Sequence, residues 1–447
     1  MADLVIRGGA AVTPAGLQPA DVVIASGTIA DLVPPGSPVG APETVDATGC
    51  LILPGVIDAH VHFRTPGLTH KEDWDHASLA AVAGGVTTVL DMPNTLPATA
   101  DADSLMAKAG LVAGHSRCHY GFYGALAASN LTCLPGLAAA GVLGFKVFLG
   151  ETTASLPPPD DGQLLRAWQV TAGLGLRTMV HAENAAIIRL ATAAPEGSVP
   201  AGGGDVGSLL AHGRSRPPVA EVEAVSRACL LAEAAGAPIA IAHLSTAGAA
   251  QVVRRAKGEG VDVRGETCPH YLLLTEREVV TLGALAKVNP PLRSAADRDA
   301  LWQAVGDGTI DQLGSDHAPH TPAEKACGDL QQAPAGFAGV QNSLPLLLGD
   351  PRLSVRRLVE LLCEGPARNW GLWPRKGRIA RGADADLAVV RPVPGRLPPR
   401  QWSLHPDSPV LRCRPARAEV LATVVGGRTA FRDGLPCGPA TGVWLRP

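Results

Sequence analysis

The sequence predicts an α/β protein: a parallel (β/α)8 barrel with a small β-sandwich domain formed by both chain ends. Three observations carry this prediction. Between residues 57 and 320 a short apolar segment, a polar or Gly-rich loop and a helix-compatible stretch alternate eight times. That region spans 264 residues, the length of one such barrel. The two ends of the chain share a different, β-type pattern.

The eight barrel strands are expected at apolar segments rich in β-branched residues. Their ranges are 57–64, 86–94, 119–126, 145–150, 177–184, 239–246, 262–274 and 310–320. Helical spacing follows between them, for example at Leu164, Trp168 and Thr171, with acidic residues opening several helices. Residues 195–218 are rich in Gly and Pro, which predicts an inserted loop over one barrel face.

The chain ends are expected to form one small domain. Residues 21–33 and 418–431 both show apolar β-type runs broken by a Ser-Gly or Gly-Gly turn. We therefore expect a β-sandwich from residues 1–55 with 375–447, beside a barrel from residues 56–374.

Composition limits the class of partner. The chain has 38 Lys and Arg against 41 Asp and Glu, with no basic block, which argues against nucleic acid or an anionic membrane as partner. No apolar run approaches the roughly 20 residues that span a bilayer. The nine cysteines are scattered without CxxC spacing and are expected to be reduced. A cytoplasmic enzyme with a small-molecule substrate fits these features.

The chemistry-bearing residues fall late in separate predicted strands. His60 and His62 are two positions apart, so one strand face carries both imidazoles. Alone, such a pair is more often packed or exposed than functional. However, four further polar residues occupy the same late position in other strands: Lys146, His181, His243 and Asp316. Barrel active sites assemble from these strand ends.

Four histidines and one aspartate suit a divalent metal, zinc above all, although manganese or cobalt also binds nitrogen and oxygen ligands. Lys146 is the unusual member of the group. It could form a salt bridge or extend its amine toward solvent. Alternatively, burial lowers the pKa of a lysine, and a neutral amine can react with CO2 to give a carbamate that bridges two cations.

Five segments resemble the cyclic amidohydrolases, the group that holds dihydroorotases, hydantoinases or dihydropyrimidinases, and allantoinases. The segments are DAHVHFRTPG, FKVFLG, VHAEN, AHLST and SDHAPH. The resemblance implies two zinc ions, one held by His60, His62 and Asp316 and the other by His181 and His243. It also implies that carboxylated Lys146 bridges them and that Asp316 is the catalytic proton shuttle; the alternative is that Asp316 only binds metal. It further implies a homodimer or homotetramer.

Residues beside the metal ligands indicate the substrate. Arg64 lies on the strand face of His62, where a guanidinium can hold a carboxylate by two parallel bonds. Dihydroorotate has a ring carboxylate, whereas hydantoin, dihydropyrimidines and allantoin do not. By the resemblance, the substrate-binding positions of dihydroorotases coincide with Arg64, Asn94, Asn289, His320, and Ala335 and Gly336 in the segment 333–340. Asn94 and Asn289 could instead close turns beside prolines, and His320 could cap a loop.

These residues favour a dihydroorotase that interconverts L-dihydroorotate and N-carbamoyl-L-aspartate in pyrimidine biosynthesis. Some features point elsewhere. Thr65 replaces a common acidic residue, and GLTHKEDW and GGVTTVLDMPN also resemble hydantoinases and allantoinases. An allantoinase or hydantoinase is therefore the alternative, and a non-catalytic scaffold is a third reading, disfavoured because all six metal positions are occupied. Thr152 and Thr153 are expected in a loop that closes on the substrate, and His119, His270 and His317 are expected to be structural.

Overall fold

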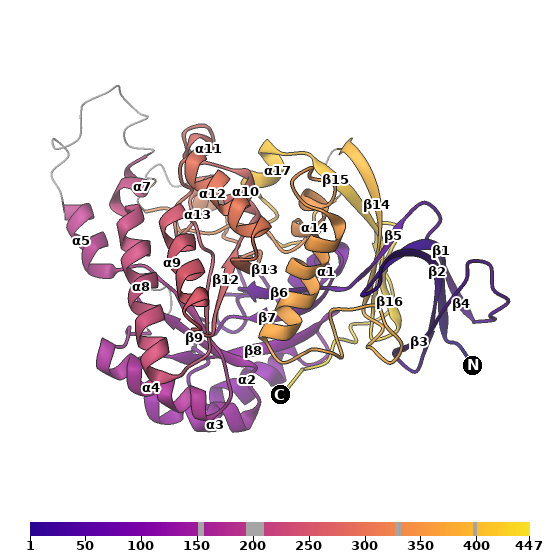
Figure 1. Ribbon diagram of the computed structural model, residues 1–447, viewed down its shortest axis with the longest axis horizontal. Coiled ribbons are helices and arrows are strands. Elements are labelled where there is room, and N and C mark those ends of the chain that lie inside the picture. Colours follow the sequence, from indigo (N-terminus) through magenta and orange to yellow (C-terminus); the bar gives the residue numbers. More distant parts are fainter. Residues whose placement is uncertain (151–155, 194–209, 327–329, 331, 397–399) are drawn as a thin grey trace.

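The computed structural model describes residues 1–150, 156–193, 210–326, 330, 332–396 and 400–447. Figure 1 shows a barrel of strands enclosed by helices, with a separate sheet at one side that contains the N-terminus. The predicted fold class is confirmed: an eight-stranded, nearly closed parallel barrel lies beside a largely antiparallel sheet.

The barrel strands follow each other in sequence order around the barrel. They are β6 (Val56–Val61), β7 (Val86–Asp91), β8 (His119–Leu126), β9 (Gly144–Phe148), β10 (Thr178–His181), β11 (Ile239–Ile241), β12 (Val263–Thr267) and β13 (Ile310–Leu313). Each pair of neighbours from β6 to β13 is parallel. A bridge between Val61 and His317 brings the first strand next to the last. The ends that carry the polar residues therefore meet at one mouth.

Several strands are shorter than the sequence predicts, always at the carboxyl end. The predicted strand 262–274 ends at Thr267, and Pro269 opens the helix α10 (Pro269–Leu273). Proline is favoured in the first turn of a helix and cannot donate to a sheet. The apolar residues beyond it are buried because this helix packs on the barrel, so burial alone did not distinguish helix from strand.

Helices cover the outside of the barrel. The longer ones are α1 (Trp74–Ala83), α2 (Ala102–Val112), α3 (Leu134–Ala140), α4 (Asp161–Gly173), α5 (Ala185–Ala193), α8 (Pro218–Ala235), α9 (Ala247–Gly258), α11 (Glu276–Leu282) and α12 (Ala295–Gly306). Shorter ones are α7 (Ala211–Ser215), α13 (Pro322–Lys325), α14 (Ser343–Leu347), α15 (Val355–Val359), α16 (Gly365–Asn369) and α17 (Pro409–Cys413). Single turns of other helix types are η1 (Leu131–Cys133), η3 (Gly283–Ala286) and η4 (Glu360–Glu364).

The helix starts follow ordinary capping chemistry. The side chains of Asp73, Asp101 and Asp160 accept backbone N–H groups at the starts of α1, α2 and α4. In α4, Leu164 and Trp168 face the barrel and are buried, as the helical spacing predicts. Most of the predicted inserted loop at 195–218 lies outside the described residues.

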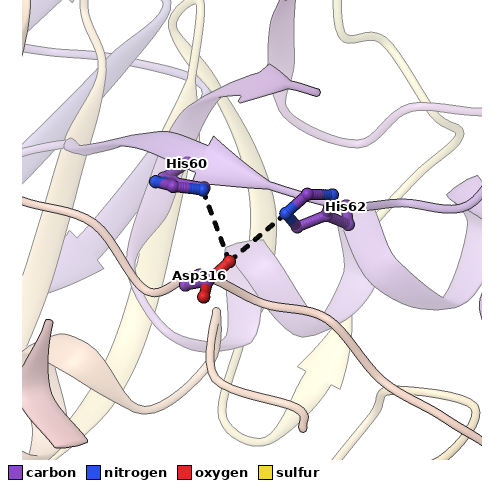
Figure 2. A group of neighbouring side chains, drawn as sticks. All are labelled: His60, His62 and Asp316. Atoms are coloured by element: carbon purple, nitrogen blue, oxygen red, sulfur yellow. Dashed lines mark ion pairs between the residues drawn. The ribbon is translucent and has the colours of Figure 1, made fainter. Parts of the chain in front are cut away.

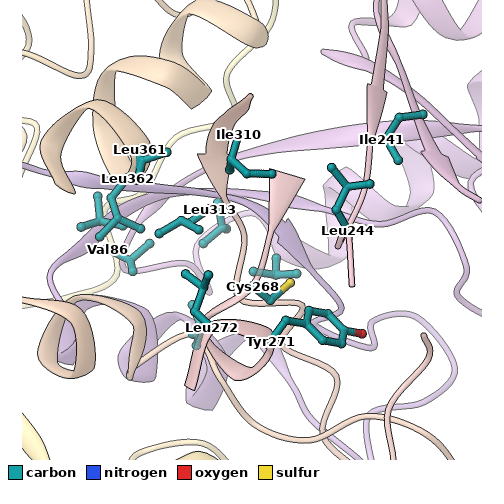
Figure 3. Close-up of a cluster of buried hydrophobic side chains, with 14 of the residues drawn as sticks. Val86, Ile241, Leu244, Cys268, Tyr271, Leu272, Ile310, Leu313, Leu361 and Leu362 are labelled. Atoms are coloured by element: carbon teal, nitrogen blue, oxygen red, sulfur yellow. The ribbon is translucent and has the colours of Figure 1, made fainter. Parts of the chain in front are cut away.

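One apolar core joins the strands to the helices. Figure 3 shows part of it, where Leu272 of α10 lies near Leu313 of β13 and Cys268. Each fully buried aliphatic side chain contributes about 1.5–3 kcal/mol relative to exposure. This packing holds the strand ends, and so the polar residues on them, in place.

Both chain ends build a single sheet of nine strands. They are β1 (Leu4–Thr13), β2 (Gly16–Ala25), β3 (Thr28–Val33), β4 (Glu43–Asp46), β5 (Leu51–Pro54), β14 (Leu387–Arg396), β15 (Ala416–Val425), β16 (Arg428–Arg432) and β17 (Leu435–Pro436). The expected sandwich thus takes the form of one connected ladder, in which β5 of the N-terminal part pairs with β14 of the C-terminal part. Residues such as Ile6 and Val389 form a core of its own. The exact domain boundaries stay a prediction.

A buried ionic cluster joins the sheet to the barrel. The Asp386 carboxylate accepts bonds from the Lys376 amine and the Gly426 N–H, and lies 3.3 Å from Nε2 of His119 on β8. Burial opposes the charge of Asp386, but Lys376 and His119 outweigh it and hold the pKa of this carboxyl well below its usual range. His119 is therefore structural, as predicted.

No described helix has both the length and the apolar composition needed to cross a membrane. Eight cysteines lie in the described part of the chain and all eight are free thiols. Cys327 lies outside the described residues.

Candidate active site

A cavity of about 250 Å³ opens at the carboxyl ends of the barrel strands. Eleven of the twelve predicted site residues line it: His60, His62, Arg64, Asn94, Lys146, His181, His243, Asn289, Asp316, Ala335 and Gly336. The twelfth, His320, does not line the cavity but contacts the carbonyl of Ala335, which does. The remaining lining residues are Phe148, Val288, Ala318 and Pro334. Thr152 and Thr153 lie outside the described residues.

His60, His62 and Asp316 form a compact group in which one donor atom from each residue lies within 4.8 Å of the others. Figure 2 shows the two rings, carried by β6 and the residue after it, turned toward the same carboxylate oxygen. Oδ1 of Asp316 lies 3.3 Å from Nε2 of His60 and 3.2 Å from Nε2 of His62. Asp316 reaches this place from a backbone with φ of 49°, an uncommon conformation for a non-glycine residue.

The far sides of both rings are held by other side chains. Nδ1 of His60 lies 2.6 Å from the carboxylate of Glu266, and Nδ1 of His62 lies 2.9 Å from the amide oxygen of Asn94. Glu266 is in turn bound by the Gln312 amide at 2.6 Å. These acceptors place the ring protons on Nδ1, so each Nε2 has a lone pair toward Asp316. Burial lowers the pKa of His62 to about 3, which keeps that ring neutral, as a metal ligand must be.

His181 and His243 form a second group across the cavity. Nδ1 of His181 and Nε2 of His243 are 2.9 Å apart. The other nitrogen of His181 contacts Glu183 at 3.0 Å, and Glu183 also pairs with Arg216. Burial lowers the pKa of both histidines, so both rings are neutral, and the two nitrogens that face each other hold one proton or one cation between them.

Lys146 lies on β9 beside these rings with 1% of its surface exposed. Its Nζ has no hydrogen-bond partner and no carboxylate within ion-pair distance among the described residues. Burial lowers the pKa of Lys146 to about 8. The salt-bridge and solvent-extended alternatives therefore do not describe this side chain. Phe148, two residues later on the same strand face, places its ring 5.0 Å from the amine.

The donor set fits divalent metal. Three imidazole or carboxylate donors face one point, and two imidazole nitrogens face another. In addition, Nζ of Lys146 and Nδ1 of His243 are buried polar atoms without a hydrogen-bond partner among the described residues. Separations of 2.9–3.3 Å between donor atoms match neighbouring ligands at about 2.0–2.2 Å from one ion.

Arg64 follows the metal-facing strand with φ of 63° and is buried. Its NH2 group donates to the Pro319 carbonyl at 3.3 Å, whereas its Nε has no hydrogen-bond partner among the residues that the structure describes. Burial lowers the pKa of Arg64 to about 10, and the charges of four carboxylates oppose that effect. These four carboxylates belong to Asp316, Asp91, Glu324 and Glu72. These carboxylates offset only part of the cost of burying the charge of Arg64.

The loop at the rim depends on a glycine. Gly336 has φ of +123°, and a Cβ there would come within 2.5 Å of the Ala318 carbonyl oxygen. Nearby, His320 accepts from the Lys71 amine through Nδ1 at 3.2 Å, which leaves Nε2 to donate to the Ala335 carbonyl at 3.0 Å. The Oδ1 atom of Asn289 is buried and has no hydrogen-bond partner.

Two histidines outside the site differ in how they are held. Nδ1 of His317 accepts the Gly339 N–H at 3.1 Å and its ring packs on Phe63, so its predicted structural role is confirmed. His270 is buried, and its Nε2 has no hydrogen-bond partner among the described residues. Its ring packs between Tyr271 and Phe337, and burial lowers its pKa to about 4, so it acts as a neutral aromatic group.

Sequence reasoning missed Glu266 and Phe148. Both left a signal. Glu266 is a carboxylate in the middle of a predicted strand, where an unpaired buried charge is costly. Phe148 stands two positions after Lys146, hence on the same strand face.

Comparison with known proteins identifies relatives over the full length. The model of the amidohydrolase family matches residues 51–430. An allantoinase of Rubrobacter xylanophilus is 40% identical over 458 residues, covering 100% of this chain and 98% of that protein. An L-hydantoinase of Paenarthrobacter aurescens is 34% identical, covering 95% and 94%. The solved structure of L-hydantoinase (dihydropyrimidinase) from Arthrobacter aurescens superposes with a TM-score of 0.93 at 31% identity, covering all of both chains.

The prediction of a dihydroorotase is therefore wrong, and with it the place in pyrimidine biosynthesis. The relatives are named allantoinase and hydantoinase, which is the alternative that the sequence left open. The physical reason lies at Arg64. The predicted partner of its charge was a substrate carboxylate, whereas in the structure the guanidinium donates to the Pro319 carbonyl and is partly stabilised by the charges of carboxylates from distant segments.

Proposed function

The chain belongs to the amidohydrolase family, and from this premise we propose that it is a metal-dependent cyclic amide hydrolase that opens the hydantoin ring of allantoin. The observation that carries the reaction class is the convergence of His60, His62 and Asp316 with His181, His243 and Lys146 in one cavity. The observation that favours allantoin is full-length similarity to several allantoinases, at 40%, 37% and 36% identity.

We assign His60, His62 and Asp316 to one zinc ion and His181 and His243 to a second, with Lys146 as a carbamate between them. When bound, such a pair supplies an activated water at neutral pH and polarises the carbonyl under attack. Carbamate formation would use the neutral amine that burial of Lys146 favours, and would give its orphaned nitrogen an anionic group.

Asp316 is the proposed proton carrier. Burial opposes its charge, but His60, His62 and His243 outweigh that effect and hold its pKa well below the usual range. The carboxylate is therefore ionised and can accept the proton that the nucleophile loses. Its Oδ1 atom faces the two histidines. The Asp316 carboxylate can then deliver the proton to the ring nitrogen of the substrate as the amide bond breaks.

Two buried polar groups of the cavity suit the ureido substituent of allantoin. That substituent presents N–H donors and a carbonyl acceptor. Oδ1 of Asn289 is a buried acceptor and Nε of Arg64 a buried donor, neither with a partner in the described part of the chain, and both residues line the cavity. A substrate that pairs with both atoms removes the cost of leaving them unsatisfied. Phe148 and Val288 offer apolar surface to the ring.

A hydantoinase is the second candidate, because the superposed structure at TM-score 0.93 is an L-hydantoinase. Ring-opening rates on allantoin, hydantoin, dihydrouracil and L-dihydroorotate separate the candidates, measured with zinc-loaded protein by chromatography of the N-carbamoyl products. We expect kcat/KM for allantoin to exceed that for hydantoin at least about ten-fold, as one satisfied buried polar pair predicts. Faster turnover of hydantoin would favour the second candidate, and no ring opening of any substrate would refute the proposed reaction class.

The homodimer or homotetramer and the cytoplasmic location stay predictions from the sequence. Light scattering of the purified protein tests the first.

A further inference from the structure

A second cavity, of about 130 Å³, lies where helices α10, α12 and α14 of the barrel meet α17 and β15 beside the small domain. Figure 1 shows these elements brought together from sequence positions more than a hundred residues apart. The cavity shares no lining residue with the proposed active site. Its lining carries four guanidinium groups and a single carboxylate: Arg298, Arg352, Arg414, Arg417 and Asp350.

Arg352 is fixed in this cavity by two contacts. Its Nε and NH2 groups each donate to one oxygen of the Asp350 carboxylate at 2.9 Å. The plane of the guanidinium lies 4.0 Å from the ring of Trp302 on α12. Asp350 is itself buried, and burial opposes its charge, but the bonds from Arg352 and the charge of Arg417 hold its pKa below the usual value. Both oxygens of the only carboxylate in the lining are thus occupied.

The other three arginines are less fully matched. Arg298 pairs with Asp299 at 2.8 Å and Arg414 with Glu278 at 3.1 Å, both carboxylates outside the lining. Arg417 has no carboxylate within ion-pair distance among the described residues. Its one hydrogen bond there is a long contact of 3.5 Å to the Gly349 carbonyl. The hollow therefore has an excess of positive charge.

We propose that this arginine pocket binds a small phosphate-type oxyanion. Guanidinium groups repel each other when they converge, and an oxyanion with several acceptor oxygens relieves that repulsion through paired charge-assisted bonds. The volume suits a compact tetrahedral anion better than a large ligand. The same chemistry is presented by free phosphate and by the phosphate of a nucleotide. The site is independent of the proposed ring-opening reaction.

Calorimetric titration of the full-length, zinc-loaded protein with inorganic phosphate at constant ionic strength tests the site. We expect saturable binding that Arg417→Gln and Arg298→Gln each weaken about ten-fold, the effect of losing a charged hydrogen-bond donor. Both residues are at the surface, so melting temperatures without phosphate report whether the variants fold. Arg255→Gln is the matched control, since this arginine of α9 is 70% exposed and lies outside both cavities.

Absence of saturable binding overturns the proposal. So does phosphate binding that is equally tight in the wild type, Arg417→Gln and Arg298→Gln, because the anion then occupies another place, such as the catalytic cavity. Titration with adenosine monophosphate identifies the source. Tighter, Arg417-dependent binding of the nucleotide indicates a phosphate carried by a larger molecule, and Arg417-dependent binding of inorganic phosphate alone indicates the free anion; either result supports the site.

Discussion

The two halves of the proposed metal centre are held in different ways. In the half with His60, His62 and Asp316, both rings are bound from behind by Glu266 and Asn94. In the half with His181 and His243, the two rings face each other at 2.9 Å and Lys146 has no hydrogen-bond partner. The orientation of the two rings in the first half is therefore set by protein groups, whereas the second half contains buried polar atoms that have no partner among the described residues.

Glu266 joins the two halves. Its Oε1 atom accepts from Nδ1 of His60 and, at 3.4 Å, from the backbone N–H of His243. Behind it, Gln312 is bound by Asn369 and by the indole of Trp370. We therefore expect the rings of the first half to keep their positions when metal is removed. The side chains of the second half should become less ordered without it.

Replacement of Asp316 should have the largest effect. Asp316→Asn keeps the shape of the side chain but removes the base, so we expect kcat for allantoin to fall about 10³-fold or more. Steady-state kinetics with metal analysis measures this change. Asp103→Asn, at an exposed position of α2, is the control and should leave kcat unchanged. A loss of less than ten-fold in Asp316→Asn would show that another group carries the proton.

Loss of Lys146 should affect the second half selectively. In Lys146→Ala we expect about one metal ion per chain in place of about two, and a fall in kcat of roughly 10²-fold or more. A short carboxylate such as acetate fits the space of a carbamate and should restore part of the activity. Mass spectrometry of metal content and kinetics with added acetate measure both effects. Two bound ions and an unchanged kcat in Lys146→Ala would show that Lys146 does not bridge the two ions.

Glu266→Gln should weaken the first half without emptying it. The amide keeps an acceptor for Nδ1 of His60 but loses the charge. Hydrogen-bond partners of metal ligands typically contribute 10- to 100-fold to metal affinity, so we expect a loss of affinity of about that size. Competition with a chelator measures the affinity. Glu276→Gln, at an exposed position of α11, should bind metal like the wild type. Wild-type metal affinity in Glu266→Gln would mean that packing alone orients His60.

The smallest effect should be one of specificity. Arg64→Gln removes the proposed donor to the ureido group, so kcat/KM for allantoin should fall about ten-fold while that for hydantoin changes less than about three-fold. Paired kinetics on the two substrates measures the difference. An equal loss on both substrates would assign Arg64 a structural role at the Pro319 carbonyl instead.

Much of the architecture was predictable because it follows from local patterns. The repeated apolar segments predicted the barrel strands, and the late position of His60, Lys146 and Asp316 in them predicted that they meet. The ends of strands were less predictable. The predicted strand 262–274 ends at Thr267 and its later residues form α10, and only Pro269 marks the change.

The sequence by itself determined where the site lies, because parallel strands must bring their carboxyl ends, and the ligands on them, to one mouth. The reaction class followed from the resemblance of five segments to the cyclic amidohydrolases. Only the tertiary structure decided which charges surround each group. Glu324 and Glu72 lie near Arg64 through folding and not through spacing, and four arginines from distant segments converge on a second cavity. Electrostatic interactions depend on distance in space and on burial, and neither quantity can be read from the order of residues along the chain.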